Sequence, residues 1–274
     1  MKKAAEGGYD TVIFVGGQNH FQDLEGHDRP NMKLLYAQDK LIEELFEVVP
    51  DMIMVMFSGS PVEMPWISRV HTLVWSWFNG MEGGTALAEI LFGKVNPSGR
   101  LPETFPISHR DCSAHCIGEF PGEKTVDYAE CIFVGYRYYD TRQVPVLFPF
   151  GYGLSYTEFV YSNLIEAFLV PAGTLPQDSH SIYPNFKVSV DVTNDGNAAG
   201  KEVVQIYVGK PDSQVERAMK ELRGFTKLEL QPGETKTAEV TLDEAAFTYF
   251  DENLRHFVTE SGEYKIFAGK SVAE

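Results

Sequence analysis

The chain has 274 residues, of which 43% are hydrophobic and 13% aromatic, so it is long and apolar enough for two globular domains and is not a disordered polypeptide. Its formal net charge is −16, which argues against nucleic acid or an anionic membrane as a partner, because both require a basic surface. A neutral substrate or a protein partner remains compatible with this charge.

Cysteine content and hydropathy indicate the cellular setting. The two lysines near the start are not followed by the long apolar stretch of a secretory signal, and no apolar run is long enough to span a membrane. The three cysteines are Cys112, Cys116 and Cys131, an odd number that does not indicate a disulfide framework. Histidines, an aspartate and two of the cysteines gather at 109–116, but their spacing matches no zinc template. We therefore expect a cytoplasmic protein and an ordinary loop at 109–116.

The first third of the chain alternates apolar runs with helical patterns. A helix end is expected at 2–6. The run at 11–16 has the pattern of a strand buried on both faces, and the runs at 52–57 and 71–77 predict further strands. A helix is expected at 84–92. This alternation is typical of a parallel α/β lobe.

A second helix is expected between the first two strands. In the segment 36–48, Leu41, Leu45 and Val48 fall on one helical stripe, which we expect to face the core. Pro50 ends the pattern.

Proline, glycine and aromatic residues dominate the middle of the chain, from residue 93 to about 159. Such segments lie over a domain surface and pack through their rings. We expect a structural role for the tyrosines and tryptophans here and in the lobe, which are Trp66, Trp75, Trp77, Tyr136, Tyr138 and Tyr139.

From about residue 157 the apolar positions alternate with a period of two, which is typical of half-buried strands. Turn signals stand at 194–196 and 231–233, and an exposed loop is expected at 171–184. Short strands with frequent turns predict a β-sandwich. The expected strands cover 186–192, 203–208, 225–230, 237–242 and 262–269.

Several segments, in the same order, resemble the family 3 glycoside hydrolases, chiefly the β-glucosidases. They are EGHDRPNM (25–32), GSPVEMPW (59–66), EGGTALAEILFGKVNPSGRLPETFP (82–106), FVGYRYYD (133–140), FPFGYGLSYTEF (148–159) and TNDGNAAGKEVVQIYV (193–208). The resemblance implies that residues 1–150 are the later part of the α/β-sandwich domain. It implies a fibronectin type III-like domain at 157–274. The catalytic barrel and the first elements of the α/β domain would be absent.

The resemblance also implies a catalytic residue. The loop FQDLEGHDRPNM at 21–32 follows the first apolar run and matches the acid/base loop of the family, which makes Glu25 the general acid/base. Retaining hydrolysis needs a second carboxyl group about 5–5.5 Å away as nucleophile. In this family the nucleophile lies on the barrel, outside this chain. The sequence departs from the family pattern at His27, Met81 and Cys131, and His27 could alter the hydrogen bonding of the loop.

Three further residues of the loop are candidates for substrate binding. Phe21 could stack on a sugar ring, although packing is the alternative, and Asp28 and Arg29 could form an ion pair that shapes the loop, or a solvated surface pair. No metal or cofactor is implied. The expected partners are a β-glucoside or oligosaccharide and the missing barrel. Apolar surface left uncovered by the missing elements makes a homo-oligomer a further expectation.

The resulting hypothesis is a portion of a retaining β-glucosidase that acts on terminal non-reducing β-D-glucosyl residues and is inactive without its barrel. Xylosidase and N-acetylglucosaminidase specificities stay open. One alternative is a non-catalytic carbohydrate-binding or scaffolding module. Another is a flavodoxin-like nucleotide or flavin binder, but Glu82-Gly83-Gly84 is better interpreted as a helix start than as a phosphate-binding loop.

Overall fold

The structure is a computed structural model that describes residues 6–26, 28–118, 120–169 and 185–274. Its contacts group the chain into two units: residues 1–94 with 105–116, and residues 95–104 with 117–274. Most of the helix expected at 2–6, the role of His27 and the loop expected at 171–184 fall outside the described residues.

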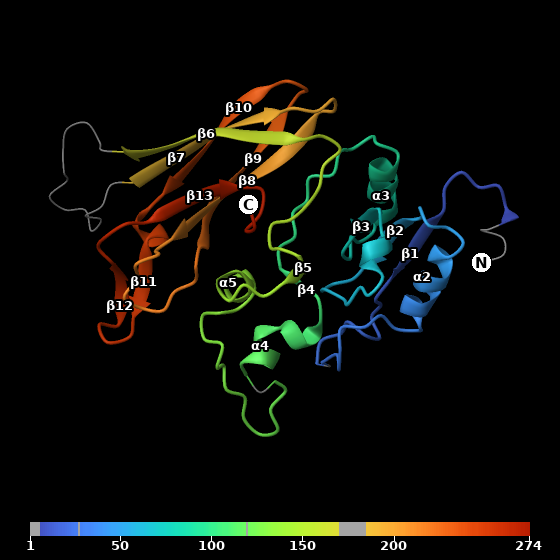
Figure 1. Cartoon of the computed structure of the whole chain (residues 1–274), viewed down its shortest axis with the longest axis horizontal. Helices are drawn as coiled ribbons and strands as arrows, with labels where there is room; N and C mark the ends of the chain where they lie inside the picture. Colours follow the sequence, from blue (N-terminus) through green and yellow to red (C-terminus); the bar gives the residue numbers. More distant parts are fainter. Residues whose placement is uncertain (1–5, 27, 119, 170–184) are drawn as a thin grey trace. The chain divides into compact units, whose positions relative to one another are not determined.

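The first unit is built on a parallel sheet in the order β1-β2-β3 (Figure 1). The strands are β1 (Ile13–Gly17), β2 (Ile53–Phe57) and β3 (Thr72–Trp75). The central strand β2 carries Met54, Val55 and Met56, all fully buried. The predicted parallel α/β lobe is confirmed.

Strand β1 is not buried on both faces, as its apolar run predicts. Ile13 and Val15 point to the same face and are exposed, Val15 by 60% of its surface. β1 lies at the edge of the described sheet and pairs with β2 alone. A continuous apolar run indicates that both faces of a strand can be buried. It does not indicate whether another element packs on each face.

Helix α2 (Gln38–Phe46) follows β1 and is shorter than the predicted 36–48. Tyr36 and Ala37 have φ values of 59° and 55°, so the left-handed backbone delays the helix until Gln38.

The predicted core stripe of α2 is wrong. Leu41 and Val48 are exposed and Leu45 is half-buried, whereas the fully buried side chains are Ile42 and Phe46. Asp39 lies on the same face as Ile42 and Phe46, and its Oδ1 accepts a hydrogen bond of 2.9 Å from Trp66 Nε1. Burial raises the pKa of the Asp39 carboxyl, and this hydrogen bond opposes the increase. The contact turns the Asp39 face inward, which periodicity alone cannot reveal.

The remaining elements of the first unit are short. Helix α3 begins directly after Glu82, so the interpretation of 82–84 as a helix start is confirmed. Trp66 is buried, and Trp75 packs edge-on against Phe105 with ring centroids 4.7 Å apart. These elements are η1 (Ile67–Arg69), α3 (Gly83–Leu91), β4 (Phe105–Pro106), η2 (His109–Asp111) and α4 (Ser113–Cys116).

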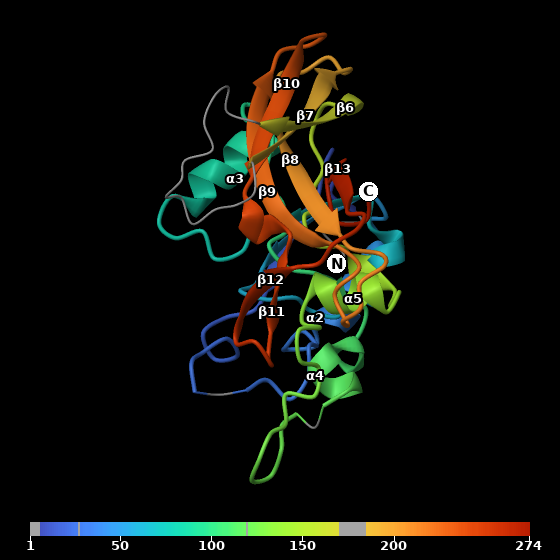
Figure 2. The ribbon, with the colours of Figure 1, turned by 90° about the vertical axis from the view of Figure 1, so that its left-hand side faces the viewer.

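The second unit contains the predicted β-sandwich, which is confirmed (Figure 2). One sheet has the order β10-β7-β6 and the other β13-β8-β9, and their inward side chains form one apolar core. Val192, Val204 and Leu230 are fully buried there. The strands are β6 (Phe159–Leu169), β7 (Asn185–Asn194), β8 (Gly200–Gly209), β9 (Glu221–Leu230), β10 (Thr235–Leu242) and β13 (Lys265–Gly269).

A hairpin and a short helix flank the sandwich. The hairpin pairs β11 (Thr248–Asp251) with β12 (His256–Thr259) after η3 (Glu244–Ala246), and it lies at one end of the two sheets in both views (Figures 1 and 2). Helix α5 (Tyr136–Thr141) precedes β5 (Val146–Phe148). Tyr136 stacks on Phe150 at 4.7 Å, and its hydroxyl accepts the backbone N–H of Leu222 at 2.8 Å. The aromatic segments thus pack structurally, as expected.

Residues 95–104, called the strap below, also belong to the second unit. Asn96 donates to the carbonyl of Ala199 at 2.9 Å and accepts from the backbone N–H of Tyr156 at 2.8 Å. Arg100 forms an ion pair of 2.7 Å with Glu202 on β8. The domain boundary expected near 150–157 stays a prediction. It separates two family domains, whereas the two units described here are defined by contacts in the structure.

Among the described residues, no helix is both long and apolar enough to cross a membrane.

Candidate active site

The candidate site lies at the carboxyl ends of the parallel strands, where open α/β sheets bind their ligands. The loop at 18–37 leaves β1, and the loop at 58–66 leaves β2. Gln18 joins them, because its backbone N–H donates to the Phe57 carbonyl at 2.8 Å and its Oε1 accepts from the Ser58 hydroxyl at 2.6 Å. The two loops therefore lie side by side.

Gln38, the first residue of α2, closes the 18–37 loop at its base. Its Nε2 donates to the Gly17 carbonyl at 2.8 Å, and its Oε1 accepts from the Gly17 N–H at 2.9 Å. Gly17 has a φ of 133°, and a Cβ there would overlap the Phe57 carbonyl oxygen, so only glycine fits. The two ends of the loop are thus held at one point.

Arg29 fixes the middle of the loop. Its Nη2 donates to Ser60 Oγ at 2.9 Å and to the Pro61 carbonyl at 3.3 Å, both in the loop after β2. The Asp23 carboxylate packs against Gly59 of that same loop, in the space where a Cβ would stand. Arg29 therefore acts on the shape of the loop, and the partners described for it lie in the neighbouring loop.

The other predicted site residues lie on the outer part of the loop. Glu25 and Asp28 are exposed, and Phe21 is 86% exposed. Leu24, beside Glu25, also has an exposed side chain, and Gly26 has a φ of 82°. The structure thus places an apolar and acidic tip on a base that is held by fixed contacts.

Sequence reasoning did not identify the residues that hold the base of this loop. Gln18, Gly17 and Gln38 carry no catalytic signature, and only the contacts show that they act together. Ser60 and Pro61 stand in the GSPVEMPW segment of the resemblance, which was a usable signal.

The expectation of an ordinary loop at 109–116 is wrong, because this segment forms η2 and α4. His109 and His115 pack edge to face at 4.7 Å, and the Cys116 thiol donates to the Arg110 carbonyl. Within the described ranges, no group of three histidine, cysteine, aspartate or glutamate side chains could hold a metal ion.

Comparison with known proteins gives the family. The model of the glycosyl hydrolase family 3 C-terminal domain matches residues 1–156, and that of the fibronectin type III-like domain matches residues 202–272. A β-glucosidase of Bacteroides ovatus is 44% identical over 270 residues, which is 97% of this chain and 35% of the relative. The thermostable β-glucosidase B of Acetivibrio thermocellus is 44% identical over 275 residues, covering 98% of this chain and 34% of the relative.

Solved structures give the same result. The crystal structure of a β-glucosidase from Kluyveromyces marxianus in complex with glucose is similar with a TM-score of 0.88 and 39% identity, over 99% of this chain and 31% of that one. A family 3 β-glucosidase from Bifidobacterium adolescentis has a TM-score of 0.86 and 35% identity, over 96% of this chain and 37% of that one. The chain spans about a third of the length of these relatives, and it belongs to glycosyl hydrolase family 3, within which it corresponds to the C-terminal domain followed by a fibronectin type III-like domain.

Proposed function

We propose that this chain supplies the acid/base part of a retaining β-glucosidase active site, with Glu25 as the general acid/base. The nucleophile comes from a barrel domain outside the chain. The observation that carries the proposal is the placement of Glu25, which stands exposed at the tip of a loop whose base and middle are held by Gln38 and Arg29. Such a loop can present one carboxyl group to a partner surface at a fixed position.

The chemistry requires a carboxylic acid that stays protonated until the glycosidic oxygen leaves. Desolvation raises a carboxyl pKa, and apolar neighbours are how glycosidases achieve it. Leu24, the residue before Glu25, and Phe21 in the same loop are exposed, so a domain that covers this loop removes water from the Glu25 carboxyl group as well. The same group then acts as a base toward water in the second step.

Phe21, Asp28 and Arg29 have supporting roles in this proposal. Phe21 and Asp28 are available to contact the sugar, since both side chains are exposed on the loop tip. Arg29 acts through the loop, because its guanidinium is bound to Ser60 and Pro61. We expect Phe21→Ala to raise KM more than it lowers kcat.

The proposed partners are a terminal, non-reducing β-D-glucosyl residue and the barrel domain. Ile13 and Val15 on the outer face of β1 are further apolar surface that additional elements of the α/β domain, or a second copy of the chain, could cover. The isolated chain is expected to be inactive because it lacks the nucleophile.

For the test, the chain is fused to the part of the Bacteroides ovatus relative that precedes the matching region. The hydrolysis of an aryl β-D-glucoside by the fusion protein is then measured. Glu25→Gln should lower kcat by about 10²–10⁴-fold, and azide should restore part of the turnover with an activated leaving group. Glu43→Gln is the matched control, since Glu43 is an exposed carboxylate on α2, and it should leave kcat unchanged. Equal turnover in both variants contradicts the role of Glu25.

The same assay on the 274-residue chain tests the missing nucleophile. No hydrolysis by folded protein supports a part that needs its barrel. Hydrolysis that disappears in Glu25→Gln means that the chain provides both carboxyl groups, and the proposed division of the site is then wrong. Sugar binding without turnover in the joined protein supports the alternative of a non-catalytic module.

A further inference from the structure

A second surface with the properties of a binding site lies in the other unit. A groove of about 1430 Å³ runs between the β11–β12 hairpin, the segment that leads into β9 and the residues before α5. It is called the hairpin groove here. Its volume exceeds the ~300–1,000 Å³ that is typical of sites for drug-sized ligands, so the groove has room for a ligand of several rings.

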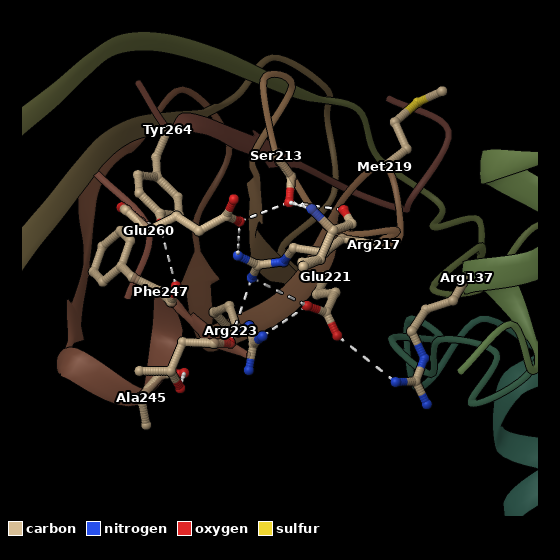
Figure 3. Close-up of polar contacts among 12 residues, drawn as sticks. Arg137, Ser213, Arg217, Met219, Glu221, Arg223, Ala245, Phe247, Glu260 and Tyr264 are labelled. Carbon is tan, nitrogen blue, oxygen red and sulfur yellow. Dashed lines mark hydrogen bonds and ion pairs between the residues drawn. The ribbon is translucent and has the colours of Figure 1, made fainter. Parts of the chain in front are cut away.

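Charged side chains that line the hairpin groove belong to a network of ion pairs and hydrogen bonds (Figure 3). Arg217 lies between two carboxylates, 3.5 Å from Glu260 and 3.9 Å from Glu221. Arg223 donates to Glu221 at 2.7 Å, and Arg137 lies 3.7 Å from the other oxygen of Glu221. Three guanidinium groups thus surround one carboxylate, and these contacts fix their orientation.

Further hydrogen bonds within the protein orient this network. Glu260 also accepts hydrogen bonds from the Ser213 hydroxyl at 2.6 Å and the Gln214 N–H at 2.7 Å. Burial acts to raise the pKa of Glu260, but these bonds and Arg217 together lower it, so the carboxylate is ionised at neutral pH. Polar groups that are already oriented lose little entropy when they bind a ligand.

The wall of the hairpin groove is aromatic. Phe250 on β11 and Phe257 on β12 are cross-strand partners, with ring centroids 5.4 Å apart in an edge-to-face arrangement. Both rings are more than half exposed. The turn between them is fixed by Asp251, whose carboxylate accepts the N–H groups of Leu254 and Asn253 at 2.9 and 2.8 Å. Two flat apolar surfaces are therefore presented beside fixed hydrogen-bonding groups.

The charges of the lining indicate the kind of ligand. Three arginines and six carboxylates line the groove, so a polyanion such as nucleic acid is repelled, and the mixed signs favour a neutral molecule that has many hydroxyl groups. A pyranose ring has an apolar C–H face that suits an aromatic surface, and its neighbouring hydroxyls match the paired donors of guanidinium and the paired acceptors of carboxylate. We propose that the hairpin groove binds a neutral oligosaccharide, separately from the Glu25 loop.

The experiment measures oligosaccharide binding by isothermal titration calorimetry on the 274-residue chain. The probes are cellotetraose, laminaritetraose and maltotetraose; choosing glucans rests on the proposed function, whereas the location of binding does not. Phe257→Ala and Phe250→Ala should each weaken binding at least tenfold. Phe225→Ala is the matched control, because Phe225 on β9 is 67% exposed, compared with 66% for Phe257, and does not line the groove. Thermal denaturation checks that all three variants stay folded.

Several results overturn the proposal. It is wrong if none of the tetrasaccharides binds at millimolar concentration, or if Phe225→Ala weakens binding as much as Phe257→Ala. It is also wrong if Phe21→Ala or Glu25→Gln abolishes binding while Phe257→Ala does not, because the sugar then occupies the Glu25 loop. A change from dimer to monomer in Phe257→Ala, without sugar binding, assigns the groove to a second copy. Failure of the Glu25 assay leaves these titrations unaffected, so the two proposals fail separately.

Discussion

The ion pair between Arg100 of the strap and Glu202 of β8 offers the sharpest test of what holds the second unit together. The two side chains are 8% and 1% exposed, and their atoms approach to 2.7 Å. The other Glu202 oxygen accepts from the Tyr161 hydroxyl at 3.1 Å. The substitution Arg100→Met removes the cation and leaves the carboxylate buried with Tyr161 as its remaining described donor.

The expected cost follows from that arrangement. Removal of one partner of a buried ion pair costs about 3–5 kcal/mol, because the other charge stays in a poor solvent. For a unit of this size, each kcal/mol lowers Tm by about 2–4 °C, so the expected decrease is about 6–20 °C. The double variant Arg100→Met/Glu202→Gln should recover about 1–3 kcal/mol, since it removes the buried charge and keeps an acceptor for Tyr161.

The measurement is urea and thermal denaturation of both single variants and of the double variant. Lys201 and Glu229 provide the control, because they form an ion pair of 3.5 Å on the adjacent strands β8 and β9 with side chains that are 51% and 61% exposed. Lys201→Met should cost at most about 1 kcal/mol. If Arg100→Met costs no more than Lys201→Met, or if the double variant is the least stable of all, then the buried charge does not dominate and the reasoning is refuted.

Two further predictions concern a glycine and a carboxylate. Gly17→Ala should destabilise the first unit by about 1–3 kcal/mol, because alanine at a φ of 133° is strained and its Cβ overlaps the Phe57 carbonyl. Gly84→Ala, in the open on α3, should instead stabilise by about 0.5–1 kcal/mol, and equal effects in chemical denaturation would contradict this. Glu260 has a lowered pKa, so its stabilisation is complete above its unfolded value near 4.5 and is lost as pH falls through the folded value. Glu260→Gln should therefore be less stable at pH 7 and lose less stability on acidification, as followed by Tm between pH 7 and pH 3.

Much of the fold could be predicted because the apolar patterns are local. The run that became β2 holds the fully buried Met54, Val55 and Met56, and the period-two segments became β7, β8 and β10. The strand β6 was not predicted as an element, since a bulge between Ser162 and Ile165 interrupts its alternation. The exposure of Ile13 on β1 and the orientation of α2, which is set by Trp66, depend on how residues far apart in the sequence pack together. Such packing cannot be predicted from the local pattern of a single sequence.

The candidate site was predicted unevenly for the same reason. The loop at 21–32 carries a characteristic run of residues, and Glu25 was predicted on that basis. The residues that hold the base of the loop are two glutamines, a glycine and a serine, which are common in all proteins. Arg29 illustrates the limit, because its position beside Asp28 suggested a local ion pair, and its hydrogen bonds to Ser60 and Pro61 appear only in the folded chain.

The strap has a consequence for how such chains can be recombined. Residues 95–104 stand inside the stretch that matches the α/β family domain, yet Asn96 and Arg100 are bound to the β-sandwich. A gene segment that begins at the sandwich's own first strand therefore codes for an incomplete folding unit. Exchange of this sandwich between proteins, in evolution or in the laboratory, preserves its packing only if the strap is inherited with it.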